Sequence, residues 1–227
     1  MEQEIPESLK VVRERAIDRP KYRGVLHAYC FFLSVPVGVI LIITSPSPRT
    51  SFAAAAFAFG ISSMLGISAL FHRTKFSDHG WMRFRRLDHI GIYLCIAGGY
   101  TPIGMLAVSG WVQKTLLITA WAGVAIGAII RFLPFDPPYG LMNALFLSMG
   151  WVAIVAIPQL SDFLDLTWLI LLAIGGALYT TGAFVVGLRR PDPWPDIFGY
   201  HEIWHLMVVL AALLHYCVMA FGVIPNA

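Results

Sequence analysis

Charged residues are scarce in this chain, and apolar residues are abundant. Of its 227 residues, 13% are charged and 58% are hydrophobic, whereas a soluble domain carries roughly 25% charged residues. One small water-soluble core cannot bury this much apolar surface, so the composition indicates a lipid bilayer as the solvent. The formal net charge is only +3, and we expect no nucleic-acid partner from so weak a positive charge.

Cysteine is also rare, and the chain does not open on an apolar run. Cys30, Cys95 and Cys217 all lie in apolar stretches, and no two of them form a C-x-x-C pair. We interpret them as small buried hydrophobic residues rather than as metal or redox sites. Residues 1–23 are polar and charged, so we expect no cleavable signal peptide and interpret the first apolar stretch as a membrane anchor.

Seven long apolar segments follow, each close to the ~20 residues that a membrane-spanning helix needs. They cover residues 24–44, 52–71, 87–108, 112–132, 141–157, 166–188 and 201–224. Turn signals separate several of them, and we expect residues 134–138 to end the fourth segment and Pro158 to end the fifth. The sequence therefore predicts an all-α fold, a seven-transmembrane-helix bundle over residues 24–227, preceded by an N-terminal tail over residues 1–23.

Lysine and arginine are distributed unevenly over the predicted loops. Fourteen of the sixteen fall in the N-terminal tail and after the second, fourth and sixth segments, while only Arg49 and Lys114 fall on the other side. Short cytoplasmic loops carry an excess of these residues. We therefore predict a cytoplasmic N-terminus and, with seven spans, a C-terminus outside, in an integral multi-pass protein of the plasma (inner) membrane.

Ionisable residues gather at the cytoplasmic ends of three predicted segments. His72 ends the second segment, Asp88 opens the third, and His201 and His205 open the seventh. Because the second segment runs inward and the other two run outward, we expect all four residues at one membrane depth. Ionisable side chains within a membrane are costly, and they usually face the bundle interior or a cavity.

The spacing of the histidines favours a metal site. His201 and His205 are four residues apart and share one helix face, which suits two imidazoles on one zinc ion. His72 would add a third nitrogen and leave one coordination position open, the pattern of a catalytic zinc site. Ser68, four residues before His72, and Asp88 would then hold or deprotonate a zinc-bound water. An all-imidazole set favours zinc, copper or nickel over magnesium or calcium.

The seventh segment also opens with an H-E-x-x-H pattern, a zinc-protease signature in which the glutamate is the base. The identity of the base therefore stays open between Glu202 and Asp88. A protease of this kind usually takes its third ligand downstream, where the remaining histidine, His215, would lie ~15 Å deeper in the helix. This distance weakens the protease interpretation and favours His72 as the third ligand.

Each of these residues also has a simpler explanation. His72 alone would commonly be an interfacial or capping residue, Asp88 alone would serve as the N-cap of the third helix, and Ser68 alone would be a small packing residue. Their joint occurrence at one predicted depth favours the metal site. His27, in the first segment, is the best candidate for a further participant.

Three blocks of this sequence resemble the hemolysin III family, within the progestin and adipoQ receptor superfamily. The blocks are residues 68–72, residues 86–89 with 96–102, and residues 198–205. The resemblance implies a zinc ion bound by the three histidines, with Asp88 contacting the zinc-bound water and Ser68 supporting it. The superfamily is also similar to membrane-bound alkaline ceramidases, which hydrolyse a lipid amide. Many family members carry a Glu and an Asn ahead of a Thr-His pair in the first segment. In this chain only His27 corresponds to that motif.

These features lead to one preferred function and two alternatives. We expect a zinc-dependent hydrolase that acts on an amide or ester bond of a membrane lipid and serves membrane lipid homeostasis. The first alternative is a receptor-like protein, or a regulator of membrane state, in which zinc is structural. The second is a pore-forming hemolysin, which we rank last because the sequence has no polar stripe to line a wide channel.

Overall fold

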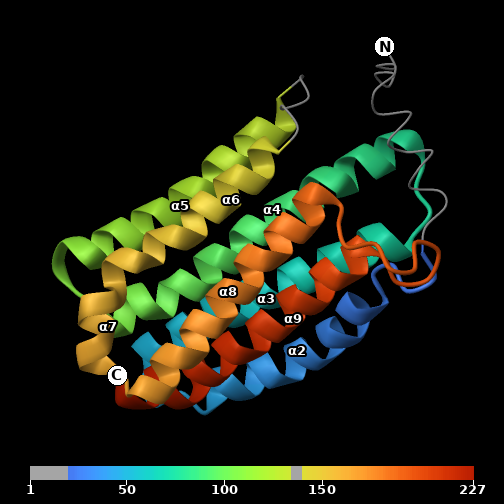
Figure 1. Ribbon diagram of the computed structural model, residues 1–227. Helices are drawn as coiled ribbons and strands as arrows, with labels where there is room; N and C mark the ends of the chain where they lie inside the picture. The colour runs from blue at the N-terminus through green and yellow to red at the C-terminus, as the bar shows by residue number, and fades with distance from the viewer. Residues whose placement is uncertain (1–19, 134–139) are drawn as a thin grey trace.

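The computed structural model describes residues 20–133 and 140–227, and within these ranges the chain is helical with no β-strand. Seven stretches are long and apolar enough to cross a membrane, so the predicted seven-helix bundle is confirmed. They are α2 (Val25–Ile43), α3 (Pro48–Arg73), α4 (Asp78–Pro102) with η1 (Ile103–Ala107), α5 (Gly110–Phe132), α6 (Leu141–Trp151) with η2 (Val152–Ala156) and α7 (Ile157–Phe163), α8 (Leu166–Leu188), and α9 (Tyr200–Val218) with η3 (Met219–Val223) and η4 (Ile224–Asn226). In Figure 1, α2 begins at one end of the bundle and the C-terminus lies at the other.

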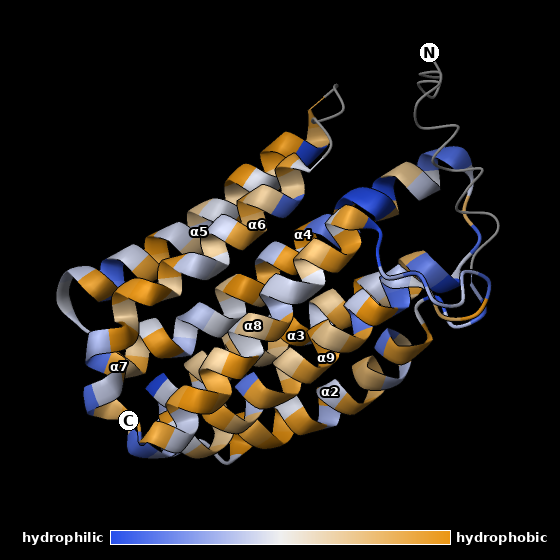
Figure 2. Cartoon of the chain, viewed as in Figure 1, coloured by the Kyte–Doolittle hydropathy of each residue, from blue (hydrophilic) through white to orange (hydrophobic). Residues whose placement is uncertain are grey.

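The outer surface of the bundle is apolar. Phe32 and Ile43 each expose 73% of their surface, and Leu166 exposes 71%. Figure 2 shows mostly apolar residues along the spans and hydrophilic residues gathered at the helix ends and connections. In water so much exposed apolar surface would drive aggregation, whereas in a bilayer it faces hydrocarbon. The chain is an integral multi-pass membrane protein.

The third span begins earlier than predicted. α4 starts at Asp78 rather than at residue 87, and Ser77 caps it, since its hydroxyl accepts a hydrogen bond from the backbone N–H of Gly80 at 3.3 Å. Hydropathy misses these first turns because they carry several arginines. Asp88 therefore lies well inside α4, so the predictions that it opens the helix or serves as its N-cap are wrong.

The fifth span is longer than predicted, and the prediction that Pro158 ends it is wrong. Pro158 occupies the first turn of α7, where a proline removes no helical hydrogen bond because that N–H has no partner in any helix. The tighter helix η2 leads the chain into α7, and the span continues to Phe163. Residues 134–138, predicted to end the fourth segment, lie outside the described residues, as does most of the predicted tail.

Glycines set the contact between α3 and α4. A Cβ atom on Gly60 would lie 2.5 Å from the carbonyl oxygen of Leu94, and one on Gly98 would lie 2.8 Å from the carbonyl oxygen of Ala56. Only glycine lets two helix backbones approach this closely, and such small-residue contacts are the usual way that helices associate in lipid. This contact fixes the register of the two helices that carry His72 and Asp88.

Candidate metal centre

Three histidines from two helices that are far apart in the sequence converge at one end of the bundle. His72 lies in the last turn of α3, and His201 and His205 lie in the first two turns of α9. One ring nitrogen from each side chain lies within 4.8 Å of the other two. The ring centroids are 4.6–5.0 Å apart. The predicted convergence of these three residues is therefore present.

The spacing of the nitrogens fits a shared metal ion. Two nitrogens bound at ~2.0–2.1 Å to one tetrahedral ion lie roughly 3.3 Å apart, and the Nε2 atoms of His72 and His201 are 3.2 Å apart. A hydrogen bond between two neutral rings would have a similar length, but it would not account for the third ring, which belongs to His205. The cluster is compatible with a bound metal.

A turn at a glycine packs the start of α2 closely against His72. Gly24 has a φ of 74°, in the left-handed region that favours glycine, and a Cβ atom there would lie 2.5 Å from the Cβ of His72. Any side chain at this position would displace the histidine. The turn thus covers His72, which is only 7% exposed, from the side of the first span.

The start of α9 is held by a network that engages Glu202. One carboxylate oxygen of Glu202 accepts a hydrogen bond from the backbone N–H of Gly199 at 2.9 Å, and the other accepts one from the Nε of Arg23. The side chain of Glu202 is 2% exposed, and that of Arg23 is 16% exposed. Glu202 therefore caps α9 and ties it to Arg23, two residues before α2, although it belongs to the H-E-x-x-H pattern.

Asp88 lies beside the histidine cluster, with Ser68 next to it. Its Oδ2 atom is 3.9 Å from the Nε2 of His72, and its carboxylate accepts a hydrogen bond from the hydroxyl of Ser68. The α3–α4 register produces this pairing, because Gly91 packs against Met64 one turn deeper, where an added Cβ would lie 3.2 Å from the Cα of Met64. Unlike Glu202, Asp88 faces the cluster.

His27 contributes a fourth imidazole ring from α2. It is 2% exposed, and its ring stacks on that of His205 with centroids 3.8 Å apart. Neither ring nitrogen has a hydrogen-bond partner among the described residues. The sequence identified His27 only as a further candidate, because hydropathy and spacing say nothing about which helices pack together.

Two arginines in this region have roles that the sequence did not indicate. In the sequence, Arg23 and Arg131 counted only as charges that orient the chain. In the structure, Arg23 forms the ion pair with Glu202. Arg131 of α5 is 7% exposed and lies close enough to Asp88 for its charge to act on the carboxylate. His215, in contrast, lies deeper in α9 with its Nε2 atom 3.4 Å from the carbonyl oxygen of Leu172. It takes no part in the cluster.

The chain is similar to known proteins over nearly all its length. Residues 15–216 match the family described as "Haemolysin-III related". Hemolysin-3 of Bacillus cereus is 36% identical over 209 residues, which cover 90% of this chain and 91% of that protein. An adiponectin receptor protein of Drosophila melanogaster is 31% identical over 181 residues, covering 71% of this chain and 40% of that protein.

A human relative extends this similarity to vertebrates. The monocyte to macrophage differentiation factor of Homo sapiens is 26% identical over 195 residues, which cover 84% of this chain and 78% of that protein. The family match includes α3, α4 and most of α9, the helices that carry the three histidines and Asp88. This seven-helix membrane protein belongs to the hemolysin III family, within the progestin and adipoQ receptor superfamily.

Proposed function

We propose that this protein is a zinc-dependent hydrolase that cleaves an amide or ester bond of a membrane lipid. One observation carries the proposal: three imidazole nitrogens lie within 4.8 Å of one another, and a carboxylate oxygen lies 3.9 Å from one of them. Three nitrogen ligands with a nearby general base are the parts of a hydrolytic zinc site. The site lies at the ends of membrane spans, where lipid linkages are found.

His72, His201 and His205 would hold the ion. Imidazole ligands suit zinc, copper or nickel better than magnesium or calcium, and zinc needs no redox partner to promote hydrolysis. When bound, zinc would supply Lewis-acid chemistry that makes hydroxide available from water at neutral pH. The role of the three histidines would be to hold the ion beside the carboxylate of Asp88.

Asp88 is the proposed general base, with Ser68 as its partner. A carboxylate this near the ligands can orient a water molecule and accept its proton, and the hydroxyl of Ser68 holds the carboxylate in place by its hydrogen bond. Glu202 is not proposed for this role, because both of its carboxylate oxygens are engaged by Gly199 and Arg23. The protease-like H-E-x-x-H pattern therefore supplies two ligands and a helix cap.

The proposed partner is a membrane lipid, and no nucleic acid is expected to bind. The uneven distribution of lysine and arginine supports an N-terminus in the cytoplasm and a C-terminus outside. The three-histidine site would then face the cytoplasmic leaflet of the plasma (inner) membrane. Hydrolysis of acyl lipids at that depth would serve lipid homeostasis.

The test is hydrolysis by purified, zinc-loaded protein in detergent or in vesicles. Ceramides, phospholipids and other acyl lipids are supplied, and release of free fatty acid is measured for the wild type, His205→Ala and His79→Ala. His79 is an exposed histidine near the same end of the bundle and serves as the control. We expect fatty acid release by the wild type and by His79→Ala only. Zinc-loaded protein that is inert on every lipid would count against the proposal.

A second candidate is a structural metal in a receptor-like protein or a regulator of membrane state. The observation that favours it is that the histidines join the end of α3 to the start of α9, so a bound ion would cross-link two spans. This candidate predicts that metal removal lowers the thermal unfolding temperature while no lipid is cleaved. The hydrolase predicts loss of fatty acid release on substitutions that leave the fold intact.

A further inference from the structure

The third span is longer than the apolar part of a membrane is thick. From Asp78 to Ala107 it runs for 30 residues, about 45 Å of helix at 1.5 Å per residue, against ~30 Å for the hydrocarbon core. The next span begins at Gly110, so the Ala107 end lies at one face of the membrane. The surplus is therefore at the Asp78 end, where Figure 1 shows the start of α4 projecting beyond the end of α3.

This projection and the connection before it carry a dense positive charge. Residues 73–87 contain five lysine and arginine residues and only one carboxylate, that of Asp78. Four of these cations form no ion pair with a carboxylate of the described residues. We call these four side chains the basic surface: Arg73, Lys75, Arg83 and Arg86.

Aromatic contacts hold the basic surface in place. The ring of Phe76 stacks on that of Phe84 with centroids 4.2 Å apart, so the connection that carries Lys75 folds back onto α4. The guanidinium of Arg86 lies over the ring of Phe132 of α5, 5.9 Å from its centroid. A stacked guanidinium keeps its N–H groups at its edge, where they can bind phosphate oxygens in pairs. The surface is thus organised before it meets a ligand.

The depth of the basic surface matches that of lipid headgroups. About 20 residues of helix cross the hydrocarbon, and counting them back from Ala107 places its boundary near Leu87. Arg83 and Arg86 lie just beyond that boundary, within ~6 Å along the helix. The headgroup layer is about 5–7 Å thick on each side, so both side chains meet lipid phosphates rather than a soluble nucleic acid or protein.

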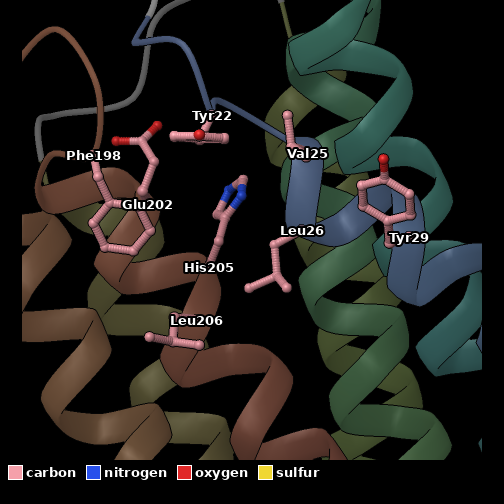
Figure 3. A pocket seen from close by; sticks show the side chains of 8 residues that line it. All are labelled: Tyr22, Val25, Leu26, Tyr29, Phe198, Glu202, His205 and Leu206. Carbon is pink, nitrogen blue, oxygen red and sulfur yellow. The ribbon is translucent and has the colours of Figure 1, made fainter.

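The pocket between α2 and α9 offers no comparable site. It has a volume of about 260 Å³, and its mostly apolar and aromatic lining includes His205 and Glu202. Figure 3 shows the carboxylate of Glu202 level with the ring of Tyr22, above His205. That carboxylate is paired with Arg23, and the described residues that line the pocket include no lysine or arginine. A phosphate therefore finds cations on α4 and none on the walls of this pocket.

We propose that the basic surface binds the phosphate of an anionic phospholipid from the leaflet around it. A zwitterionic headgroup carries an ammonium group beside its phosphate, which these cations repel, so the surface distinguishes anionic from zwitterionic lipids. The bound lipid ties the projecting turns of α4 to the membrane. The proposal goes beyond the proposed function and does not depend on it, because it requires neither a metal nor a reaction.

The test measures lipid binding to the purified protein in detergent by native mass spectrometry. Phosphatidylglycerol and phosphatidylcholine with the same acyl chains are titrated separately into the wild type and into two double variants, Arg83→Gln with Arg86→Gln and Arg83→Lys with Arg86→Lys. Lys21→Gln with Lys114→Gln is the control, since it removes two positive charges outside the basic surface. Circular dichroism verifies that each variant has folded.

We expect the wild type to bind phosphatidylglycerol about tenfold or more tightly than phosphatidylcholine. The glutamine variant should lose about 25-fold in affinity for phosphatidylglycerol, a factor of about five for each cation near an anionic headgroup, and its affinity for phosphatidylcholine should not change. The lysine variant keeps both charges, so its affinities and those of the control should stay within about threefold of the wild type.

Three results overturn the inference. The first is equal affinity of the wild type for the two lipids. The second is a lysine variant or a control as weak as the glutamine variant, which would show that the charge of this surface is not the cause. The third is release of the bound lipid by millimolar inorganic phosphate but not by chloride at the same ionic strength, which would assign the surface to a free anion.

Discussion

The imidazole rings of His27 and His205 lie face to face, with their centroids 3.8 Å apart and an angle of 6° between their planes. This contact joins a third span, α2, to a cluster whose other members come from α3 and α9. Because His27 is 2% exposed, it has no room to turn away from its neighbour. The stack holds the ring of His205 in one orientation, as the supporting residues of metal ligands commonly do.

Removal of this support should weaken metal binding. Aromatic ring pairs contribute about 0.5–1.5 kcal/mol beyond their buried area, so His27→Ala should raise the dissociation constant for zinc by about 2- to 12-fold. His27→Phe keeps a ring face against His205 and should bind zinc nearly as well as the wild type. Titration against a competing chelator measures both constants. If His27→Phe is as weak as His27→Ala, a ring nitrogen matters and not the stack.

The Arg23–Glu202 ion pair should be needed for stability. Arg23→Ala leaves the carboxylate of Glu202 buried without its partner, which typically costs about 3–5 kcal/mol. We expect about 3 kcal/mol, because the side chain of Arg23 is still 16% exposed. The double variant Arg23→Met with Glu202→Gln buries no charge and should lose less than half as much. Denaturant unfolding in detergent compares them, and equal losses would show that the charge of Glu202 is not the cause.

Asp88→Asn should separate metal binding from hydrolysis. The amide keeps the size of the side chain but cannot accept a proton, so fatty acid release should fall by about 10²–10⁴-fold, the usual contribution of a general base. The zinc content should stay at that of the wild type. Asp165→Asn, which changes an exposed aspartate before α8, is the control. An Asp88→Asn protein with full activity would remove Asp88 from the mechanism.

The α3–α4 contact should tolerate a methyl group at one glycine and not at its neighbour. Gly98→Ala places a Cβ atom 2.8 Å from the carbonyl oxygen of Ala56, whereas a Cβ atom on Gly99 meets nothing within 4 Å. Overpacking of this kind typically costs about 1–3 kcal/mol. Gly99→Ala should be neutral or slightly stabilising, since alanine favours helix more than glycine does. Thermal unfolding of the two variants in one detergent makes the comparison, and equal midpoints would contradict the register.

Much of the fold and of the cluster follows from local sequence patterns. Apolar length predicts the spans because the thickness of the bilayer fixes it, and the i, i+4 spacing puts His201 and His205 on one helix face. The topology of alternating spans then predicts that His72 joins them. The start of α4 escapes this approach because its first turns are helical but rich in arginine, so hydropathy does not detect them.

The remaining features depend on how the helices pack. The stack of His27 on His205, the ion pair of Arg23 with Glu202, and the pocket between α2 and α9 all require α2 and α9 to be neighbours. No periodicity within a single segment encodes that pairing. For the same reason the sequence left Glu202 and Asp88 equivalent as bases, and only the contacts of their carboxylates distinguish them.

The central claim is that His72, His201 and His205 hold one zinc ion, and metal analysis of the purified protein tests it most directly. Protein from cells grown in ordinary medium is analysed by elemental mass spectrometry, with His72→Ala and His205→Ala beside it and His79→Ala as the control. We predict about one zinc per chain in the wild type and in His79→Ala, and less than a tenth of that in the other two variants. A wild type with no more zinc than His205→Ala would contradict the account.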